Sequence, residues 1–365
     1  MARMSASYVF IQNGLFVTAL VTLVLYTLRP AGRITFSPTH TLELKGLAIL
    51  AILFAHIGYV LLSDDRFLYP LSTLGGVGVD LFLFLSGFGL ASSALRREGS
   101  LASFYVRRVT SLFPALWIAL AVTFIADWIL LGSQYSVAYI AQSFVGYFPQ
   151  ADVWTDIDSP LWYITLILFL YIIFPIVWSK RRPWLSAICV AMAAYVLAYF
   201  APFIFPDVAH LYSLHTYAFS LGVLGAWLAS RYEQQLLRAR DSLRGIMRIA
   251  ALCIIFAGVL YFAVNSAVGT PFEQYGNLAI AGFIVLFFAI KTSHSSFLIV
   301  LGMYSYEIYL IHWPLLSRYD VLYENVPFAV ATLLYLGIFL MLGYVLHSAV
   351  TRMRPYAMTL LSKVI

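Results

Sequence analysis

Two polar residues of one apolar stretch, Lys45 and His56, have a spacing that could support chemistry. Eleven residues make about three helical turns and rise about 16.5 Å, so both side chains lie on one face of a helix. The cation is at one end of this helix and the imidazole is about two-thirds of the way along it. A lone histidine in an apolar helix usually hydrogen-bonds a neighbouring helix. Its alignment with a cation makes a general base an equally good interpretation.

A glycine-rich stretch, residues 75–88, contains the next ionisable group, Asp80. If this stretch forms the following antiparallel helix, Asp80 lies at a depth that His56 could reach. A carboxylate beside a histidine sets its tautomer and stabilises its protonated form. We interpret Gly87 as a position of close helix packing and Asp80 as a partner of His56.

A third polar group lies late in the chain. Ser305, Tyr309 and His312 have the spacing of one helical stripe, and Glu307 lies roughly opposite them. Two histidines and two carboxylates at similar predicted depth indicate a buried polar chamber.

The composition surrounding these residues excludes a soluble protein. Hydrophobic residues make up 62% of the 365 residues and charged residues 10%, with a mean hydropathy of +0.89, whereas soluble domains are about a quarter charged. The apolar stretches are too continuous for an outer-membrane barrel, in which hydrophobic residues alternate with polar ones. The sequence therefore predicts an integral membrane protein.

We predict an all-α, polytopic transmembrane helix bundle of about eleven spans, because a span needs about 20 apolar residues. The predicted spans cover residues 8–28, 44–62, 76–95, 109–131, 161–179, 184–204, 211–229, 248–267, 276–291, 297–317 and 328–350. Alternating the loops leaves Arg3, Arg66 and Arg318 on one side and the other 19 of the 22 basic residues on the opposite side. The positive-inside rule then places the N-terminus outside and the C-terminus in the cytoplasm.

Three further features bear on function. Arg29 and Arg33 follow the first span in place of a small-residue cleavage site, so we interpret it as a retained helix and not a signal peptide. The outer loop, residues 132–160, combines aspartates with aromatic residues, which fits either an interfacial aromatic belt or a carbohydrate-binding surface. These residues are Asp152, Asp156, Asp158, Tyr135, Tyr139, Tyr147, Phe148 and Trp154. The basic stretch 231–248 favours anionic lipid contact or topology anchoring over substrate binding.

Four motifs in order make the chain similar to the membrane acyltransferase 3 family, the integral-membrane O-acyltransferases of microbial surface glycans. They are the basic residue separated from His56 by ten intervening residues, the Gly-Val-Asp run 78–88, the basic cluster leading to a proline at 107–114, and the Ser-Tyr-x-x-Tyr-Leu-x-His run 305–312. Lys45 replaces the usual Arg, Ser111 stands where a further Arg is common, and the segment after Trp162 lacks a Glu that many members have.

The resemblance implies a ten-helix acyltransferase domain at residues 40–355, preceded by an additional N-terminal transmembrane helix at 1–30. It implies transfer of an acyl group, most simply acetyl, from cytoplasmic acyl-CoA to a hydroxyl of an extracytoplasmic or lipid-linked glycan. The partners would then be acyl-CoA, a glycan or glycolipid acceptor and membrane lipids, without nucleic acid, bound cofactor or metal, in the cytoplasmic membrane. The number of subunits is left open.

The resemblance also suggests roles for the polar residues. Lys45, Arg107 and Arg108 would bind the phosphates of the donor. His56 would act as general base or carry the acyl group, and Asp80 would orient it. The late group would position the acceptor or stabilise the oxyanion, and it consists of Ser305, Glu307, Tyr309 and His312.

Two other functions fit part of the pattern. A transporter or flippase would use the intramembrane His, Asp and Glu residues to relay protons or bind substrate. It explains neither the alignment of Lys45 with His56 nor the inner basic cluster, and we see no inverted repeat. A regulatory or sensor protein descended from the enzyme is the third possibility, suggested by the missing Glu.

Overall fold

The computed structural model describes residues 6–30, 37–60, 67–97, 99–152, 156–243, 245–265 and 269–361. Several residues named above lie outside these ranges, namely Arg3, Arg33, Arg66 and Trp154.

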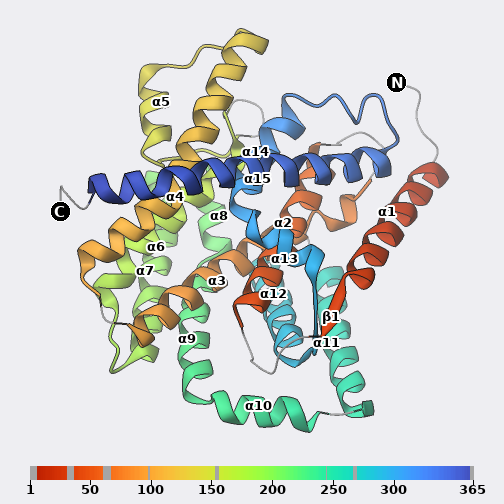
Figure 1. Cartoon of the computed structure of the whole chain (residues 1–365), viewed down its shortest axis with the longest axis vertical. Coiled ribbons are helices and arrows are strands. Elements are labelled where there is room, and N and C mark those ends of the chain that lie inside the picture. The colour runs from red at the N-terminus through yellow and green to blue at the C-terminus, as the bar shows by residue number, and fades with distance from the viewer. Residues whose placement is uncertain are drawn as a thin grey trace. The chain divides into compact units, whose positions relative to one another are not determined.

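The described chain is almost entirely helical (Figure 1). Its α-helices are α1 (Ala6–Tyr26), α2 (Pro38–Val60), α3 (Leu74–Arg96), α4 (Leu101–Ala126), α5 (Val137–Phe144), α6 (Trp162–Val177), α7 (Pro183–Ile204), α8 (Ala209–Leu214), α9 (Ala218–Arg231), α10 (Glu233–Ser242), α11 (Gly245–Asn265), α12 (Glu273–Ile290), α13 (Ser296–Met303), α14 (Ser305–Ser317) and α15 (Phe328–Leu361). Short 3₁₀ turns cover Tyr69–Leu71 and Ser159–Leu161, and a π-helical turn covers Asp127–Leu131. Two three-residue strands, β1 (Leu28–Pro30) and β2 (Ser293–Ser295), pair antiparallel.

Among the described residues, nine helical segments are long and apolar enough to cross a membrane. This confirms the predicted all-α membrane protein. The predicted spans 211–229 and 297–317 differ, because each consists of two shorter helices, α8 with α9 and α13 with α14. The 13 residues of α14 rise only about 20 Å, which is less than the thickness of a bilayer core. Such breaks are tolerated where protein buries them, and His215 and Ser305 at the two breaks are buried.

The chain divides into two compact units. The first comprises the described residues of Met1–Ser92, Tyr217–Ser305 and Val321–Leu336, and the second comprises those of Ser93–Thr216, Tyr306–Asp320 and Gly337–Ile365.

Glycines set the close helix crossings of the first unit. A Cβ on Gly46 of α2 would lie 1.9 Å from the Leu298 carbonyl oxygen of α13. A Cβ on Gly87 of α3 would lie 2.1 Å from the Phe219 carbonyl oxygen of α9. The interpretation of Gly87 as a close-packing position is therefore confirmed. An apolar core from α2, α3 and α12 lies beside these crossings, and its residues are Leu44, Ala48, Val77, Leu81, Leu85, Ile280, Ala281 and Phe288.

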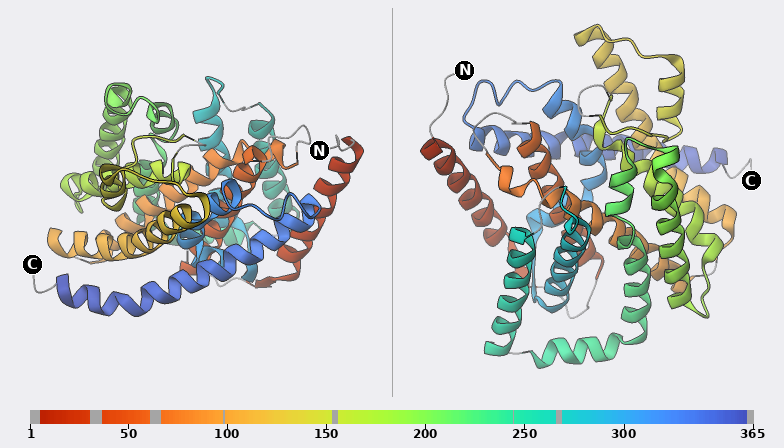
Figure 2. Two further views of the ribbon diagram at one scale, coloured as in Figure 1. Left: turned by 90° about the horizontal axis from the view of Figure 1, so that it is seen from above. Right: turned by 180° about the vertical axis from the view of Figure 1, so that it is seen from behind.

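Two smaller elements complete this end of the first unit. Helix α10 joins the ends of α9 and α11 and runs across them (Figure 2). The β1–β2 ribbon pairs Leu28 with Ser295, and the Thr27 hydroxyl lies 2.8 Å from the Ser295 hydroxyl. This ribbon connects the end of α1 to the start of α13.

In the second unit, side-chain hydrogen bonds attach the segment after α5 to its neighbours. The Trp117 indole of α4 donates to the Phe144 carbonyl at 2.7 Å. The Thr165 hydroxyl of α6 accepts from the Phe148 N–H at 2.7 Å and lies 3.2 Å from the Gly146 carbonyl oxygen. These contacts fix the path of the chain between α5 and α6.

Candidate active site

The predicted site residues belong to both units. Lys45, His56, Asp80 and Ser305 belong to the first, and Arg107, Arg108, Glu307, Tyr309 and His312 belong to the second.

In the first unit, α2 and α3 are packed with almost no space between them. A Cβ on Gly75 would lie 3.0 Å from the Ala55 Cβ, and one on Gly78 would lie 2.7 Å from the Ala48 carbonyl oxygen. Gly75 therefore lies at the level of His56, and Asp80 follows about 7.5 Å further along α3. Asp80 is buried and His56 is half-buried. The structure brings their two helices together, and the pairing of the side chains stays a prediction.

Asn277 of α12 is a candidate that the sequence reading missed. It is 1% exposed, and a Cβ on Gly76 would lie 2.2 Å from its amide nitrogen. In the described part of the chain, no atom accepts a hydrogen bond from this amide nitrogen. A buried donor left without a partner costs about 1–3 kcal/mol, so a group on a substrate would stabilise it. The signal in the sequence is a single amide inside an apolar span.

A buried ion pair near Lys45 was also missed. The Lys291 ammonium binds the Glu43 carboxylate, whose Oε1 accepts from the Ser295 N–H at 2.7 Å. The ammonium also lies 3.8 Å from the centre of the Phe288 ring. Burial lowers the pKa of Lys291, whereas the contact with Glu43 opposes that shift. The signal was available, because Glu43 is an acid at the beginning of an apolar helix.

In the second unit, a backbone carbonyl sets the tautomer of His312. Its Nδ1 lies 2.7 Å from the Tyr309 carbonyl oxygen, and the side chain is fully buried. A carbonyl can only accept, so the proton is on Nδ1 and Nε2 keeps its lone pair. His312 can therefore accept a hydrogen bond from a hydroxyl group, as positioning of an acceptor or general-base chemistry requires.

The other late residues have partners in the protein. The Tyr309 hydroxyl donates to the Pro160 carbonyl oxygen, and the Ser305 hydroxyl donates to the Gly302 carbonyl oxygen at 3.0 Å. The Glu307 carboxylate lies 2.7 Å from His347 Nδ1 of α15. In this conformation the Tyr309 hydroxyl proton is engaged in the hydrogen bond to Pro160, in the 3₁₀ turn before α6. Donation to an oxyanion would require that proton to leave Pro160.

The two predicted donor arginines have different surroundings on α4. Arg107 is exposed, whereas Arg108 is half-buried between the rings of Phe104 and Tyr171, at 6.0 and 5.8 Å. Among the described residues, none hydrogen-bonds to the Nε of Arg108. Stacked guanidinium groups with donors to spare are suited to binding phosphate.

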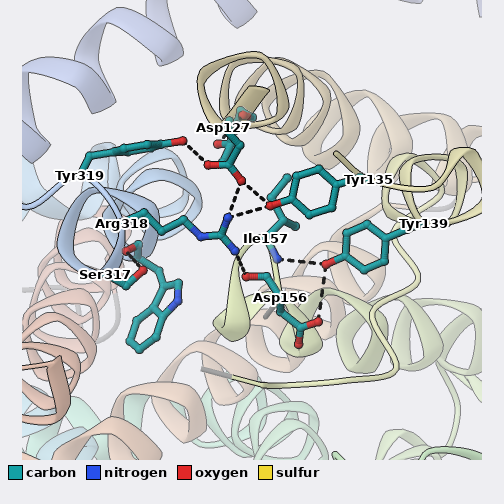
Figure 3. Close-up of polar contacts among 11 residues, drawn as sticks. Asp127, Tyr135, Tyr139, Asp156, Ile157, Ser317, Arg318 and Tyr319 are labelled. Carbon is teal, nitrogen blue, oxygen red and sulfur yellow. Dashed lines mark hydrogen bonds and ion pairs between the residues drawn. The ribbon is translucent and has the colours of Figure 1, made fainter. Parts of the chain in front are cut away.

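A polar cluster absent from the sequence prediction lies in the second unit, and Figure 3 shows its contacts. The fully buried carboxylate of Asp127 accepts from the hydroxyls of Tyr135 and Tyr319 and forms a salt bridge with Arg318. Arg318 also donates to the Asp156 carbonyl oxygen. The available signals were an acid near the end of the predicted span 109–131 and one of the three basic residues predicted to lie outside.

The same cluster bears on the outer loop. The Tyr135 and Tyr139 rings stack at 5.5 Å, and both contact Phe124. Burial raises the pKa of Asp156, whose carboxylate accepts from the Asp152 N–H. These rings and this carboxylate contact other protein groups, which favours a structural interpretation of this part of the loop over a carbohydrate-binding surface.

Comparison with known proteins adds independent information. A family model described as an acyltransferase domain matches residues 43–352. A protein of Komagataeibacter xylinus named as a membrane-bound transacylase, BcsY, is 27% identical over 300 residues, which cover 74% of this chain and 71% of that protein. An O-acetyl transferase of Shigella phage Sf6 is 28% identical over 142 residues, which cover 35% of this chain and 42% of that protein. No solved structure matches the chain.

Proposed function

This chain belongs to the acyltransferase 3 family and is a membrane acyltransferase, and from that premise we propose that it transfers an acyl group from acyl-CoA to a glycan hydroxyl. We take acetyl as the simplest acyl group, with the donor on the cytoplasmic side and the acceptor extracytoplasmic or lipid-linked. The proposal includes the cytoplasmic membrane as location, with the N-terminus outside. The names of the two relatives, a transacylase and an O-acetyl transferase, agree with this reaction class.

One observation supports the proposal most directly: Lys45 and His56 lie on a single unbroken helix, α2. Their spacing of about 16.5 Å separates a cation for the donor from an imidazole deeper in the protein. The close contact of α3 with α2 at the level of His56 fixes the helix backbone there. A general base needs such fixed surroundings, because small displacements of reacting groups reduce rates strongly.

The proposed reaction has the following sequence. His56 takes the proton of the acceptor hydroxyl as its oxygen attacks the thioester carbonyl carbon. The tetrahedral intermediate then collapses, the carbon–sulfur bond breaks, and His56 returns the proton to the leaving CoA sulfur. Asp80 orients His56 and stabilises its protonated form.

The second unit supplies the other groups in the proposal. Arg107 and Arg108 bind donor phosphates. Arg107 is exposed, and none of the described residues hydrogen-bonds to the Nε of Arg108. His312 accepts a hydrogen bond from the acceptor through Nε2. Tyr309 holds the Pro160 turn, and Glu307 contacts His347 of α15. Ser305, which belongs to the first unit, donates to the Gly302 carbonyl oxygen of α13.

Mass spectrometry of surface glycans tests the reaction. Cells with the wild-type protein should add an acyl mass that cells without the protein lack, and His56→Ala should abolish it. His210→Ala is the matched control, since His210 is an exposed histidine of α8. Wild-type acylation by a folded His56→Ala protein would show that the mechanism is wrong.

Purified protein separates transfer from transport. Acyl-CoA should be consumed only when an acceptor is present, and charge reversal at Arg107 and Arg108 should weaken acyl-CoA binding. Movement of a glycolipid without acyl consumption would favour the transporter, and unchanged acyl-CoA affinity in the charge-reversed protein would remove the proposed arginine contacts.

A further inference from the structure

The segment between α5 and α6 contains a buried carboxyl group that the proposed reaction does not use, that of Asp158. This residue is 5% exposed, and none of the described residues hydrogen-bonds to its Oδ1. It precedes the 3₁₀ turn Ser159–Leu161, but its side chain does not cap that turn. The neighbouring Asp156 differs, because its carboxylate accepts from the Asp152 N–H at 2.7 Å. In the described part of the chain, Oδ1 of Asp158 lacks a contact of this kind.

Two hydrogen bonds hold the chain around Asp158 against α14. The Tyr309 hydroxyl donates to the Pro160 carbonyl oxygen, and the Arg318 guanidinium donates to the Asp156 carbonyl oxygen (Figure 3). Tyr309 and Arg318 are nine positions apart, which is a rise of about 13.5 Å in a helix. Asp156 and Pro160 are four positions apart, and an extended chain of that length spans about 13–14 Å at most. The chain around Asp158 therefore runs alongside α14 in the opposite direction.

The stretch of α14 between these two anchors contains His312. Its Nδ1 lies 2.7 Å from the carbonyl oxygen of Tyr309, the same residue whose hydroxyl binds Pro160. Tyr309 therefore connects His312 to the chain that contains Asp158, and all of these residues belong to the second unit. Asp158 is halfway between the two anchored carbonyl groups, so it lies beside the part of α14 that holds the proposed acceptor group.

The position along α4 separates this carboxyl group from the proposed donor contacts. Arg318, which anchors one end of the chain around Asp158, forms a salt bridge with Asp127 at the end of α4. Arg108 is 19 positions before Asp127, which is about 28 Å along a helix axis. The carboxyl group therefore lies at the end of α4 opposite the proposed phosphate contacts, as a group that binds the acceptor requires.

The chemistry of a buried carboxyl group suits a sugar hydroxyl. Burial raises the pKa of Asp158 well above its usual value, with Arg318 opposing this shift. The group therefore keeps its proton over a wider pH range, and a protonated carboxyl, like a hydroxyl, both donates and accepts. A buried polar group that is paired only by its ligand also selects between ligands, because one that lacks the hydroxyl leaves the group unpaired.

We propose that Asp158 and His312 bind adjacent hydroxyl groups of the glycan acceptor, and that Asp158 thereby selects the acceptor sugar. The inference rests on the proposed function and names a contact of its acceptor. It assigns to this site a sugar ring with two neighbouring unsubstituted hydroxyls. Asp158 takes part by hydrogen bonding alone and adds no covalent step to the reaction.

Substitutions of Asp158 that differ in hydrogen bonding test this role. Asp158→Leu keeps the branched shape and removes the hydrogen bonds, whereas Asp158→Asn keeps both a donor and an acceptor. Asp158→Ala removes the carboxyl group without adding volume, so it controls for a steric effect of leucine. Asp152→Leu is the matched control, because Asp152 is exposed and lies in the same loop.

The assay follows release of the CoA thiol from acetyl-CoA by the purified full-length protein, with surface glycan isolated from cells that lack the protein as acceptor. Asp158→Leu and Asp158→Ala should raise the KM for the glycan about tenfold, as loss of a hydrogen-bonded partner predicts. The KM for acetyl-CoA should stay unchanged in both. Asp158→Asn and Asp152→Leu should keep the wild-type KM for the glycan. An unchanged glycan KM in Asp158→Leu, or an equal rise in both KM values, would overturn the proposal.

Thermal unfolding distinguishes acceptor binding from a structural role. A buried carboxyl group without a partner does not stabilise the fold, so Asp158→Leu and Asp158→Ala should not lower the Tm. The isolated glycan should raise the Tm of the wild type more than that of either variant, because a ligand stabilises the folded state that binds it. A lower Tm in both variants would assign the carboxyl group to the fold and would also overturn the proposal.

The same assay separates failure of this contact from failure of the proposed function. A wild type that transfers acetyl groups to the glycan, with an unchanged glycan KM in Asp158→Leu, would disprove the contact and leave the function intact. A wild type that neither releases CoA nor adds an acetyl mass to the glycan would disprove both. The expected result is transfer by the wild type, with a glycan KM that rises in Asp158→Leu and is restored in Asp158→Asn.

Discussion

Arg318 and Asp127 form a buried salt bridge that joins the residue after α14 to the π-helical turn at the end of α4 (Figure 3). The Asp127 side chain is fully buried and also accepts from two tyrosine hydroxyls. Helix α14 contains His312, so this pair fixes one end of the helix that holds the proposed acceptor group. We interpret Arg318 as a positioning residue of the second unit.

Arg318→Gln should strongly destabilise the protein, because it leaves the Asp127 carboxylate buried without its cation. Breaking a buried pair from one side costs about 3–5 kcal/mol. Thermal unfolding in detergent should show a lower Tm for Arg318→Gln and for Asp127→Asn. The double variant should lose less than the sum of the two, since the second substitution removes the stranded partner. Strict additivity of the losses would contradict a direct coupling.

Gly87 and Gly89 of α3 offer a matched pair of substitutions. A Cβ on Gly87 would lie 2.1 Å from the Phe219 carbonyl oxygen, whereas one on Gly89 would have no atom within 4 Å. Gly87→Ala should therefore separate α3 from α9 and cost about 1–3 kcal/mol or more. Gly89→Ala should be neutral or stabilise α3 by up to about 1 kcal/mol, because alanine favours helix. Denaturation of the two purified variants compares them, and similar losses would argue against the close crossing.

The sequence predicted the helices and their apolar character well, because a bilayer demands long apolar segments that composition reveals directly. It missed the breaks at His215 and Tyr304, since the stretches 211–229 and 297–317 are each long and apolar enough on average to be interpreted as one span. Lys45 and His56 were correctly assigned to one helix, because their spacing depends only on helical geometry.

Contacts between distant segments could not be predicted in the same way. Glu43 and Lys291 are 248 residues apart in the sequence, and nothing in either local pattern indicates that they meet. Asp127 and Arg318 are 191 residues apart, and each looked like an isolated charge near a span end. Asn277 was detectable as a polar residue in a span, but its contact with Gly76 depends on the packing of α12 against α3.

We expect the stability of the protein to depend on pH through the titration of Asp158, which lies outside the membrane-spanning segments. Burial raises its pKa well above the usual value of 3.8, with Arg318 opposing the shift. The folded state therefore binds this proton more tightly than the unfolded state, so stability is greatest below the unfolded pKa. It decreases as the pH rises from about 4 through the raised folded pKa.

Asp158→Asn removes this titration and should flatten that part of the Tm–pH profile. Asp152→Asn is the control, because Asp152 is exposed and lies in the same loop as Asp158. A wild-type Tm that rises steadily over the window above pH 4, with the same slope in Asp158→Asn, would contradict the raised pKa of Asp158.

His312→Ala should abolish acyl transfer without weakening donor binding. The Nδ1 proton is held by the Tyr309 carbonyl oxygen, so the proposed reaction uses the lone pair of Nε2 to accept from the acceptor hydroxyl. Removing a group that exchanges a proton with substrate typically costs a factor of about 10²–10⁴ in rate. Both quantities are measured on the same purified His312→Ala protein. The rate of transfer to a saturating acceptor should therefore fall, and the affinity for coenzyme A should stay unchanged. His210→Ala, a substitution at an exposed histidine, should affect neither. A parallel loss of coenzyme A affinity in His312→Ala would instead place His312 with the donor.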